Sequence, residues 1–369
     1  MRVKIITLHC PINYGAALQA YALKAHLQKE GYDAELIDYR PSYVTDKQAY
    51  TYAGSLAKSK NYLKKALYLI AKFPSRFRVK RNFGRFLKNE LCSTGVIYHS
   101  YEELKSNPPV ADVYICGSDQ IWNTNMENGW DDSFFLSFVK HGKKYSYAAS
   151  MAINRELSVE ESNRFKTQLA DYEAISVREQ DAQQILQPII KKNINWVLDP
   201  VYLLSAEQWM TLANKEKPVA KGKYILLYPM GNGENVNAVA QALSQKSGLP
   251  IYAISRSMKI KSDRVFNGYS PYQFLQLMRG AEYVVTNSFH GTSFSIIFQK
   301  NFWACSIGKT SSRIASLLGS LDLKHRYIDT PDIPYDRLVD TIDYVRPMDC
   351  LQTRLQESKS FIDYILKDK

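Results

Sequence analysis

The sequence has few of the features that build disulfide frameworks, metal centres and membrane spans. Its 369 residues include five cysteines, an odd number without a C-x-x-C pair, so neither a disulfide framework nor a zinc site is indicated. No stretch approaches the roughly 18 consecutive apolar residues that a membrane-spanning helix requires. The first residues lack the charged, apolar and small-residue regions of a signal peptide. These absences predict a cytoplasmic, globular protein with no metal site.

Acidic residues are missing from one long stretch, although the chain contains 36 of them. No Asp or Glu lies between Asp46 and Glu90, and this stretch supplies most of the net charge of +12. Aromatic residues and leucines interleave with the cations, which predicts a basic, mostly helical insertion at about 47–92. A solvated face and a peripheral contact of residues 58–88 with anionic membrane are the two open interpretations, whereas no nucleic-acid motif accompanies the charge. The cations are Lys58, Lys60, Lys64, Lys65, Lys72, Arg76, Arg78, Lys80, Arg81, Arg85 and Lys88.

The length and the alternation of strand and helix patterns predict two domains. A strand at 3–8, a helix at 16–29 and a strand at 34–39 form a βαβ opening, which is typical of a parallel sheet. Strands at 110–116, 143–150, 173–179 and 196–204 and a helix at 159–171 complete a first domain at 1–205. A loop at 214–223 leads to a second domain at 220–345, with strands at 224–230, 249–255, 282–287 and 302–305 and helices at 234–247, 271–280, 292–300 and 311–320. We expect an α/β fold of two Rossmann-like domains with parallel sheets facing across a cleft, and a C-terminal helix within 346–369 that crosses back to the first domain.

Ligands of open parallel sheets bind beyond the carboxyl ends of the strands, so the strand-to-helix turns are the candidate sites. In the first turn, Asn13, Tyr14 and Gly15 precede a helix whose N-terminus suits an anion. The alternative for this turn is a tight connection with Tyr14 packed inside. Another turn, 117-GSDQIWN-123, offers Asp119 as a proton acceptor beside Gln120, Trp122 and Asn123, which are typical of sugar-binding surfaces. Its alternative is an Asx turn with a buried tryptophan.

Two further turns place a cation and a histidine at predicted strand ends. Arg178 ends the strand at 173–179 and offers a bidentate fork to phosphate or carboxylate, unless it forms an internal ion pair with Glu179 or Asp181. His290, with Ser288, lies between a strand and a helix, where it is an acid–base candidate whose protonation would follow the binding of a dianion. The alternative is a capping or core histidine.

The loop 306-SIGKTSSRI-314 carries Lys309 and Arg313 at a helix start and contains Gly-Lys-Thr. A phosphate-binding P-loop needs glycine five residues before Gly308, and Trp303 occupies that position, so this motif is excluded. The two cations still suit an anion. Arg178, His290 and Lys309 at corresponding strand ends therefore indicate a small substrate with more than one negative charge.

Five segments together resemble the polysaccharide pyruvyl transferase family: 13-NYGAALQAYAL-23, 117-GSDQIWN-123, 176-SVRE-179, 199-DPVYLL-204 and 287-NSFHGTSFSIIF-298. The resemblance extends from about Asn13 to about Lys309, and the Ser-Phe-His-Gly block is its most specific part. It implies a GT-B-like fold, phosphoenolpyruvate as a co-substrate without a further cofactor, and a nucleotide- or lipid-linked sugar as acceptor. The reaction implied is formation of a pyruvate ketal in cell-surface or capsular polysaccharide biosynthesis.

The resemblance also assigns expected roles to the candidate residues. Arg178 and His290 match positions that contact the donor, and Lys309, Arg313 and Ser288 are expected beside them. His290 would donate a proton or assist the departure of phosphate, and Asp119 would receive a hydroxyl proton. Asn13, Tyr14, Gly15, Gln120, Trp122 and Asn123 are expected to face the acceptor or line the cleft. The alternative functions are a GT-B glycosyltransferase using a nucleotide sugar and a non-catalytic protein that binds glycans or anions.

Overall fold

The computed structural model describes residues 1–45, 77–91, 95–231, 233–254, 260–305, 312–330 and 332–367. It divides the chain into two compact units, Met1–Leu203 with Lys359–Lys369, and Leu204–Ser358. The division lies beside residue 205, where the first domain was expected to end, whereas the loop expected as a linker at 214–223 lies inside the second unit. The long C-terminal helix α13 (Val345–Lys367) contributes residues to both units.

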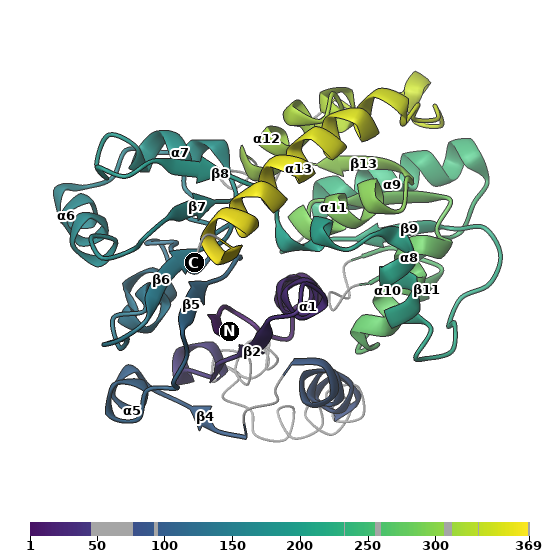
Figure 1. Ribbon diagram of the computed structural model, residues 1–369. Coiled ribbons are helices and arrows are strands. Elements are labelled where there is room, and N and C mark those ends of the chain that lie inside the picture. The colour runs from purple at the N-terminus through teal and green to yellow at the C-terminus, as the bar shows by residue number, and fades with distance from the viewer. Residues whose placement is uncertain are drawn as a thin grey trace, which may run out of the picture. The chain divides into compact units, whose positions relative to one another are not determined.

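The first unit is built around a parallel sheet with the strand order β2-β1-β5-β6 (Figure 1). Single bridges from Tyr145 to Ala174 and from Ala149 to Val177 continue the parallel pairing to β7, which pairs with β8. The predicted βαβ opening and parallel sheet are therefore confirmed. The strands are β1 (Arg2–Ile6), β2 (Asp33–Leu36), β3 (Asp38–Tyr39), β4 (Ile97–Tyr98), β5 (Val113–Cys116), β6 (Lys143–Ser146), β7 (Ile175–Val177) and β8 (Ile194–Trp196), and the helices include α1 (Tyr14–Lys29), α5 (Tyr101–Ser106), α6 (Val159–Gln168) and α7 (Gln180–Leu186).

One predicted strand is wrong over most of its length. The apolar stretch 196–204 was expected to be extended, but β8 ends at Trp196 and Pro200–Leu203 form a 3₁₀ turn. Pro200 has no N–H to donate to a sheet, and the Asp199 carboxylate accepts a hydrogen bond from the backbone N–H of Val201 at 3.0 Å. The stretch is apolar because it is buried in the first unit, and burial alone does not distinguish a strand from a turn.

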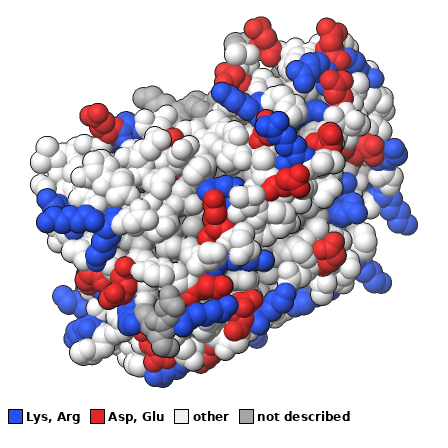
Figure 2. Space-filling view, turned by 45° about the horizontal axis from the view of Figure 1, so that its top comes forward, with Lys and Arg blue, Asp and Glu red and all other residues white. Residues whose placement is uncertain are grey.

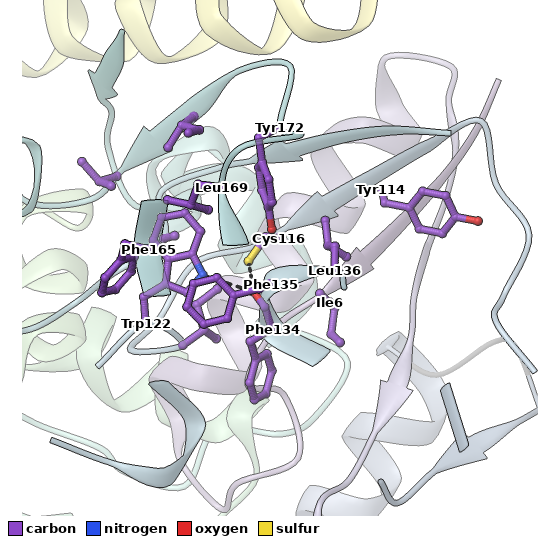
Figure 3. Packing of buried hydrophobic residues seen from close by; sticks show 14 of the residues in the cluster. Ile6, Tyr114, Cys116, Trp122, Phe134, Phe135, Leu136, Phe165, Leu169 and Tyr172 are labelled. Atoms are coloured by element: carbon purple, nitrogen blue, oxygen red, sulfur yellow. Dashed lines mark hydrogen bonds between the residues drawn. The ribbon is translucent and has the colours of Figure 1, made fainter. Parts of the chain in front are cut away.

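Aromatic side chains fill the core of the first unit (Figure 3). The Trp122 ring stacks on Phe135 with a centroid distance of 5.7 Å and meets Phe165 edge-on. Its Nε1 donates to the carbonyl of Phe134 at 3.1 Å, and the Cys116 thiol points to the same carbonyl. Trp122 is fully buried, so its assignment to the surface of an acceptor site is wrong. The ring belongs to the hydrophobic core, because it stacks on Phe135 and contacts Phe165 and Tyr172 edge-on.

The described part of the basic insertion is helical, as predicted. Residues 77–91 form a helix, with Phe83 and Phe86 buried on its inner face. Their rings lie 5.0 Å from Tyr14 and 6.2 Å from Tyr21 of α1, measured between centroids. Apolar packing therefore attaches this helix to α1 and leaves its cations outside. The rest of the predicted insertion, at 47–76 and 92, lies outside the described residues.

The second unit contains a parallel sheet with the order β11-β10-β9-β12-β13-β14 (Figure 1). Val239 and Leu243 of α9 pack with Leu227 and Val285 on one face of this sheet. Helices thus connect the parallel strands, as the alternating pattern predicted. The strands are β9 (Ile225–Tyr228), β10 (Ile251–Ala253), β11 (Arg264–Val265), β12 (Tyr283–Thr286), β13 (Asn301–Cys305) and β14 (Tyr327–Ile328), and the helices include α8 (Ala206–Ala213), α9 (Glu234–Ser247), α10 (Pro271–Gly280), α11 (Phe289–Ile297) and α12 (Ser312–Ser320).

Local signals explain where several of these helices start. Ser205 and Ser270 each form a capping box with a glutamine three residues later, and Pro271 follows at the first helical position of α10. On the face shown in Figure 2, Lys and Arg side chains are interspersed with Asp and Glu. That mixture is typical of a solvated surface.

Candidate functional site

A buried guanidinium and three carboxylates meet at the strand ends of the first unit. Arg178 follows β7, and its Nη1 lies 2.8 Å from Oδ2 of Asp199. Its Nη2 is 3.8 Å from Oδ1 of Asp119, and its Nε is 3.8 Å from Oε2 of Glu179. The Ser118 hydroxyl donates to the same Asp199 oxygen at 3.0 Å. We refer to these five residues, Ser118, Asp119, Arg178, Glu179 and Asp199, as the Arg178 cluster.

The members of the Arg178 cluster differ in their access to solvent. The side chains of Arg178, Glu179 and Asp199 are 1%, 1% and 0% exposed, whereas that of Asp119 is 11% exposed. Asp119 also has a left-handed backbone, with φ of 73°, which aspartate tolerates better than most residues. The interpretation of Arg178 as an internal ion pair thus describes the structure, with Asp199 as the nearest partner and Glu179 farther away. Asp181 is not among its ion-pair partners.

The loop after β5 is held by its own side chains. Gln120 accepts a hydrogen bond from Nδ2 of Asn123 at 2.9 Å, and Oδ1 of Asn123 accepts one from the backbone of Asn125 at 3.0 Å. Asn123 is buried, while Gln120 is half-buried and remains accessible. An exposed ring that the sequence analysis missed lies in the same loop: Trp130 is 39% exposed, and its Nε1 donates to the Thr124 carbonyl at 2.8 Å.

The turn before α1 is capped by its own asparagine. Oδ1 of Asn13 accepts hydrogen bonds from the backbone of Gly15 at 2.9 Å and Ala16 at 3.4 Å. Tyr14 is buried against Phe83, which is the packed alternative considered for this turn. Two of the N–H groups expected to meet an anion therefore already have an acceptor.

A second charged group lies near the end of β1. The fully buried ring of His9 places Nδ1 3.1 Å from the Thr7 carbonyl and Nε2 3.1 Å from Oδ1 of Asp38. Both neighbours are acceptors, so the ring donates to both only as an imidazolium. Arg40 binds the Asp38 carboxylate from the other side at 2.6 and 2.7 Å. Burial opposes ionisation, but the bonds from His9 and Arg40 win and lower the pKa of Asp38 well below its ordinary value.

The strand ends of the second unit are joined by hydrogen bonds between neutral groups. Oδ1 of Asn287 accepts from the Met230 N–H at 2.6 Å, and its Nδ2 donates to the Met230 carbonyl at 3.1 Å. The Thr286 hydroxyl donates to the Tyr228 carbonyl at 2.7 Å and accepts from the Ser288 N–H at 3.0 Å. The end of β12 is thereby fixed to the end of β9.

His290 lies in the first turn of α11. This helix begins at Phe289, three residues before the start predicted at 292. The cap of α11 is Ser288, whose Oγ accepts from the backbone of Gly291 at 3.2 Å, so capping is not the role of His290. His290 is 7% exposed, and its ring meets the Phe289 ring edge-on at 5.4 Å. A Cβ at Gly291 would lie 2.5 Å from the Thr286 hydroxyl oxygen, so only glycine lets α11 start this close to the strands.

Arg313 and Lys309 are the remaining predicted donor contacts, and the structure describes the first of them, in α12. Arg313 is half-buried in its first turn. Lys309 lies outside the described residues. Glycines at 231 and 233, with φ of 67° and 64°, shape the turn between β9 and α9. The carboxyl ends of β9 and β12 thus both lead into helix N-termini, where the helix dipole favours anions.

A cavity of about 270 Å³ lies at the opposite ends of the strands, near the amino ends of β9 and β12. Its lining includes Asn214, Tyr224, Gln276 and Gly280, which come from α8, from α10 and from the loop before β9. Tyr224 and Gly280 lie just before the first residues of β9 and β12, so the cavity is at the amino ends of these strands. Ligands of such sheets bind at the carboxyl ends, so the cavity is not the expected place for the active site.

Within the described part of the chain, no group of three or more His, Cys, Asp or Glu residues is arranged to hold a metal ion. Among the helices that the structure describes, none has the length and apolarity needed to cross a bilayer.

Sequence reasoning named Asp119, Arg178 and His290 as candidates but did not name Asp199 and Ser118, which the structure brings together with Arg178. Both lie inside motifs that were quoted, DPVYLL and GSDQIWN. The signal available was Asp directly before Pro at a strand end, which is typical of a side chain that accepts hydrogen bonds from nearby backbone.

Comparison with known proteins gives a family and a fold. The model of a family described as polysaccharide pyruvyl transferase matches residues 13–308. Among curated proteins, none matches the sequence. A putative UDP-N-acetylglucosamine 2-epimerase from Listeria monocytogenes aligns with a TM-score of 0.55 at 9% identity, covering 100% of this chain and 97% of that one. The UDP-GlcNAc 2-epimerase of Methanocaldococcus jannaschii aligns with a TM-score of 0.52 at 13% identity and full coverage of both chains. At these identities the likeness concerns the fold, which confirms an α/β architecture of two Rossmann-like domains.

Proposed function

The chain belongs to the polysaccharide pyruvyl transferase family, and on that premise we propose that it transfers the pyruvyl group of phosphoenolpyruvate to two hydroxyls of one sugar. The observation that carries the proposal is the Ser-Phe-His-Gly block, which places His290 in the first turn of α11 at the end of a parallel strand. An anionic substrate is favoured at such a helix start, and an imidazole beside it can exchange a proton with that substrate.

The proposed reaction balances without an oxidant or reductant. C3 of phosphoenolpyruvate gains a proton while a sugar hydroxyl oxygen bonds to C2. The C2–O bond to phosphate then breaks, its electron pair leaves with phosphate, and a second hydroxyl bonds to C2 to close the ketal. Of the two hydroxyl protons, one ends on the new methyl group and the other on phosphate. The reaction therefore needs one proton donor, proton acceptors and positive charge near phosphate and carboxylate.

We assign these tasks to the residues that the sequence predicted. His290 donates a proton or assists phosphate departure, and Asp119 accepts a hydroxyl proton. Lys309, Arg313 and Ser288 contact the donor. The family resemblance implies a donor contact for Arg178 as well, but its side chain is 1% exposed and lies behind Asp119, which favours a different role. The proposal contains no metal or other cofactor, because lysine and arginine side chains supply the positive charge that the donor requires.

The acceptor is proposed to be a nucleotide- or lipid-linked sugar of cell-surface or capsular polysaccharide biosynthesis. Asn13 and Gln120 are the half-buried members of the predicted acceptor residues. Asn13 also caps α1, and the buried Asn123 holds the loop after β5. In place of the buried Trp122, the exposed ring of Trp130 offers an apolar surface on which a sugar can stack.

A peripheral contact with anionic membrane is the proposed role of the basic helix. Its apolar residues are buried, and its exposed residues include Arg78, Lys80, Arg81, Arg85 and Lys88 without an exposed acid between them. Phe77, 57% exposed, adds an apolar group at the start of this face. Such a surface is attracted to anionic lipid, where a lipid-linked acceptor would be found.

The test of the reaction is incubation with phosphoenolpyruvate and candidate acceptors, with phosphate release and acceptor mass as readouts. Equal amounts of phosphate and pyruvate ketal are expected. Replacing His290 by alanine should lower kcat about 100-fold or more. The matched control is His325→Ala, which removes an exposed histidine of the same unit and should leave turnover unchanged. Full turnover by His290→Ala would refute its role, and reaction with nucleotide sugars alone would refute the donor.

Vesicle co-sedimentation tests the membrane contact separately. Binding to vesicles with phosphatidylglycerol, absent with neutral phosphatidylcholine and weakened by salt, is expected. Arg81→Gln with Arg85→Gln should weaken it, whereas Arg337→Gln with Arg346→Gln, at exposed positions of the second unit, should not. Equal binding by both double variants would contradict the proposal.

A further inference from the structure

The Arg178 cluster has more negative than positive charge. One guanidinium is surrounded by three carboxylates, a formal balance of −2. Two of the carboxylates are held by further donors. Asp199 accepts hydrogen bonds from Ser118 and Val201, both at 3.0 Å. Oε1 of Glu179 accepts three hydrogen bonds at 2.8 Å, from Ser150, Met151 and Ala152. Both are thus bound in place as hydrogen-bond acceptors.

The third carboxylate, Asp119, is the most solvent-exposed charged side chain of the Arg178 cluster. Its side chain is 11% exposed, against 1% for the guanidinium behind it. Its backbone is fixed as well, because its carbonyl accepts hydrogen bonds from Ser150 at 3.0 Å and Ile121 at 2.8 Å. A ligand approaching from solvent therefore meets Asp119 before Arg178, and an anionic donor would meet carboxylate charge first.

We propose that Arg178 is a positioning residue for Asp119 and that Asp199 orients Arg178. The 2.8 Å bond to Asp199 fixes the plane of the guanidinium, which directs Nη2 toward the Asp119 carboxylate. The guanidinium thereby holds the Asp119 carboxylate at the solvent-facing side of the cluster, where it is to accept the hydroxyl proton, and Glu179 lies beside the Nε of Arg178. This inference rests on the proposed function, since it assigns Arg178 to proton transfer and not to donor binding.

Lysine at position 178 separates the two roles, because it keeps the charge and loses the planar fork. Positioning predicts that Arg178→Lys lowers kcat about 10-fold or more, while the Kd for phosphoenolpyruvate, measured by calorimetry, changes less than about twofold. It also predicts that Arg178→Lys causes no further loss of kcat when Asp119 is already asparagine, because a residue that acts through Asp119 has nothing left to act on. A donor clamp predicts a Kd raised about 10-fold or more, which would overturn the proposal.

Ser118→Ala provides a second, milder variant in case Arg178→Lys does not fold. It removes one hydrogen bond to Asp199 and leaves every charge in place. A loss of kcat of about two- to fivefold is expected, again absent in the Asp119→Asn background. Losses that persist in that background overturn the positioning role. Absence of phosphoenolpyruvate binding and turnover in the wild-type protein would instead refute the proposed function, so the two failures are distinguishable.

Discussion

The two units present chemically different groups at the carboxyl ends of their strands. In the first unit, the Arg178 cluster brings full charges together away from water, and the buried Asp38 carboxylate binds both His9 and Arg40. In the second, Thr286, Asn287 and Ser288 make hydrogen bonds between neutral groups around the start of α11. The same parallel architecture therefore supports a buried site of paired charges and a neutral helix start.

The difference indicates how the two units divide the work of the proposed reaction. Charges that are already paired inside a protein hold one another in position, and adding another anion beside three carboxylates is unfavourable. A neutral helix N-terminus retains its dipole for an incoming anion. The first unit is thus suited to holding a proton acceptor, and the second to meeting the phosphate of the donor.

The largest effect is expected from breaking the charged cluster. Arg178→Gln leaves three carboxylates without their shared cation and should destabilise the first unit by about 3–5 kcal/mol in urea unfolding. Adding Asp199→Asn removes one of those carboxylates and should recover part of the loss. If Arg178→Gln unfolded like the wild type, the cluster would not be a stabilising unit.

A steric change in the second unit should have the next largest effect. Gly291→Ala places a methyl group 2.5 Å from the Thr286 hydroxyl oxygen and 2.9 Å from the Tyr228 ring, and should cost about 1–3 kcal/mol. Gly319→Ala in α12 is the matched control, because no atom lies within 4 Å of the added carbon there. It should be neutral or stabilising by up to about 1 kcal/mol in thermal unfolding. Equal destabilisation by both variants would show that helix geometry, and not crowding, sets the requirement.

A smaller loss is expected from the neutral cap of α11. Ser288→Ala removes the acceptor of the Gly291 N–H and should cost about 1 kcal/mol, whereas Ser288→Gly should cost a few tenths. Chemical denaturation of all three proteins measures the order. A cost as large as that of Arg178→Gln would remove the distinction between the two strand-end sites.

The smallest effect at pH 7 concerns a half-exposed ion pair of the first unit, and it depends on pH. Hydrogen bonds from Arg155 hold the pKa of the Glu161 carboxyl well below its ordinary value of 4.5. A carboxyl whose pKa is lowered in the folded state stabilises the protein at every pH above the pKa that it has in the unfolded chain. That contribution is lost as the pH falls from there toward the pKa of the folded state. Because Arg155 is 47% exposed, Glu161→Gln should cost under about 1 kcal/mol at pH 7.

Thermal unfolding of wild type and Glu161→Gln from pH 7 to pH 3 tests this expectation. The difference in stability between them should shrink as the pH falls below about 4.5. A difference that stays constant over this range would show that the contribution of Glu161 does not depend on its charge.

Much of the architecture could be predicted from local pattern. The βαβ opening, the parallel sheets and the helix at 234–247 follow from apolar periodicity, glycine stops and capping residues, which act over a few residues of chain. The stretch 196–204 could not, since an apolar run is equally compatible with a strand and with a buried turn. The start of α11 was predicted three residues late because Gly291 was taken to belong to the turn, whereas Ser288 caps the helix before it.

The sequence by itself determined which residues are candidates for chemistry, namely Asp119, Arg178 and His290, because residue type and motif order are properties of the chain. Tertiary structure alone decided what surrounds them. Trp122 became a core residue and Asp199 became the partner of Arg178, although 21 residues separate that pair. The physical reason is that burial and ion pairing depend on distances between segments that are remote in sequence, and no local pattern encodes those distances.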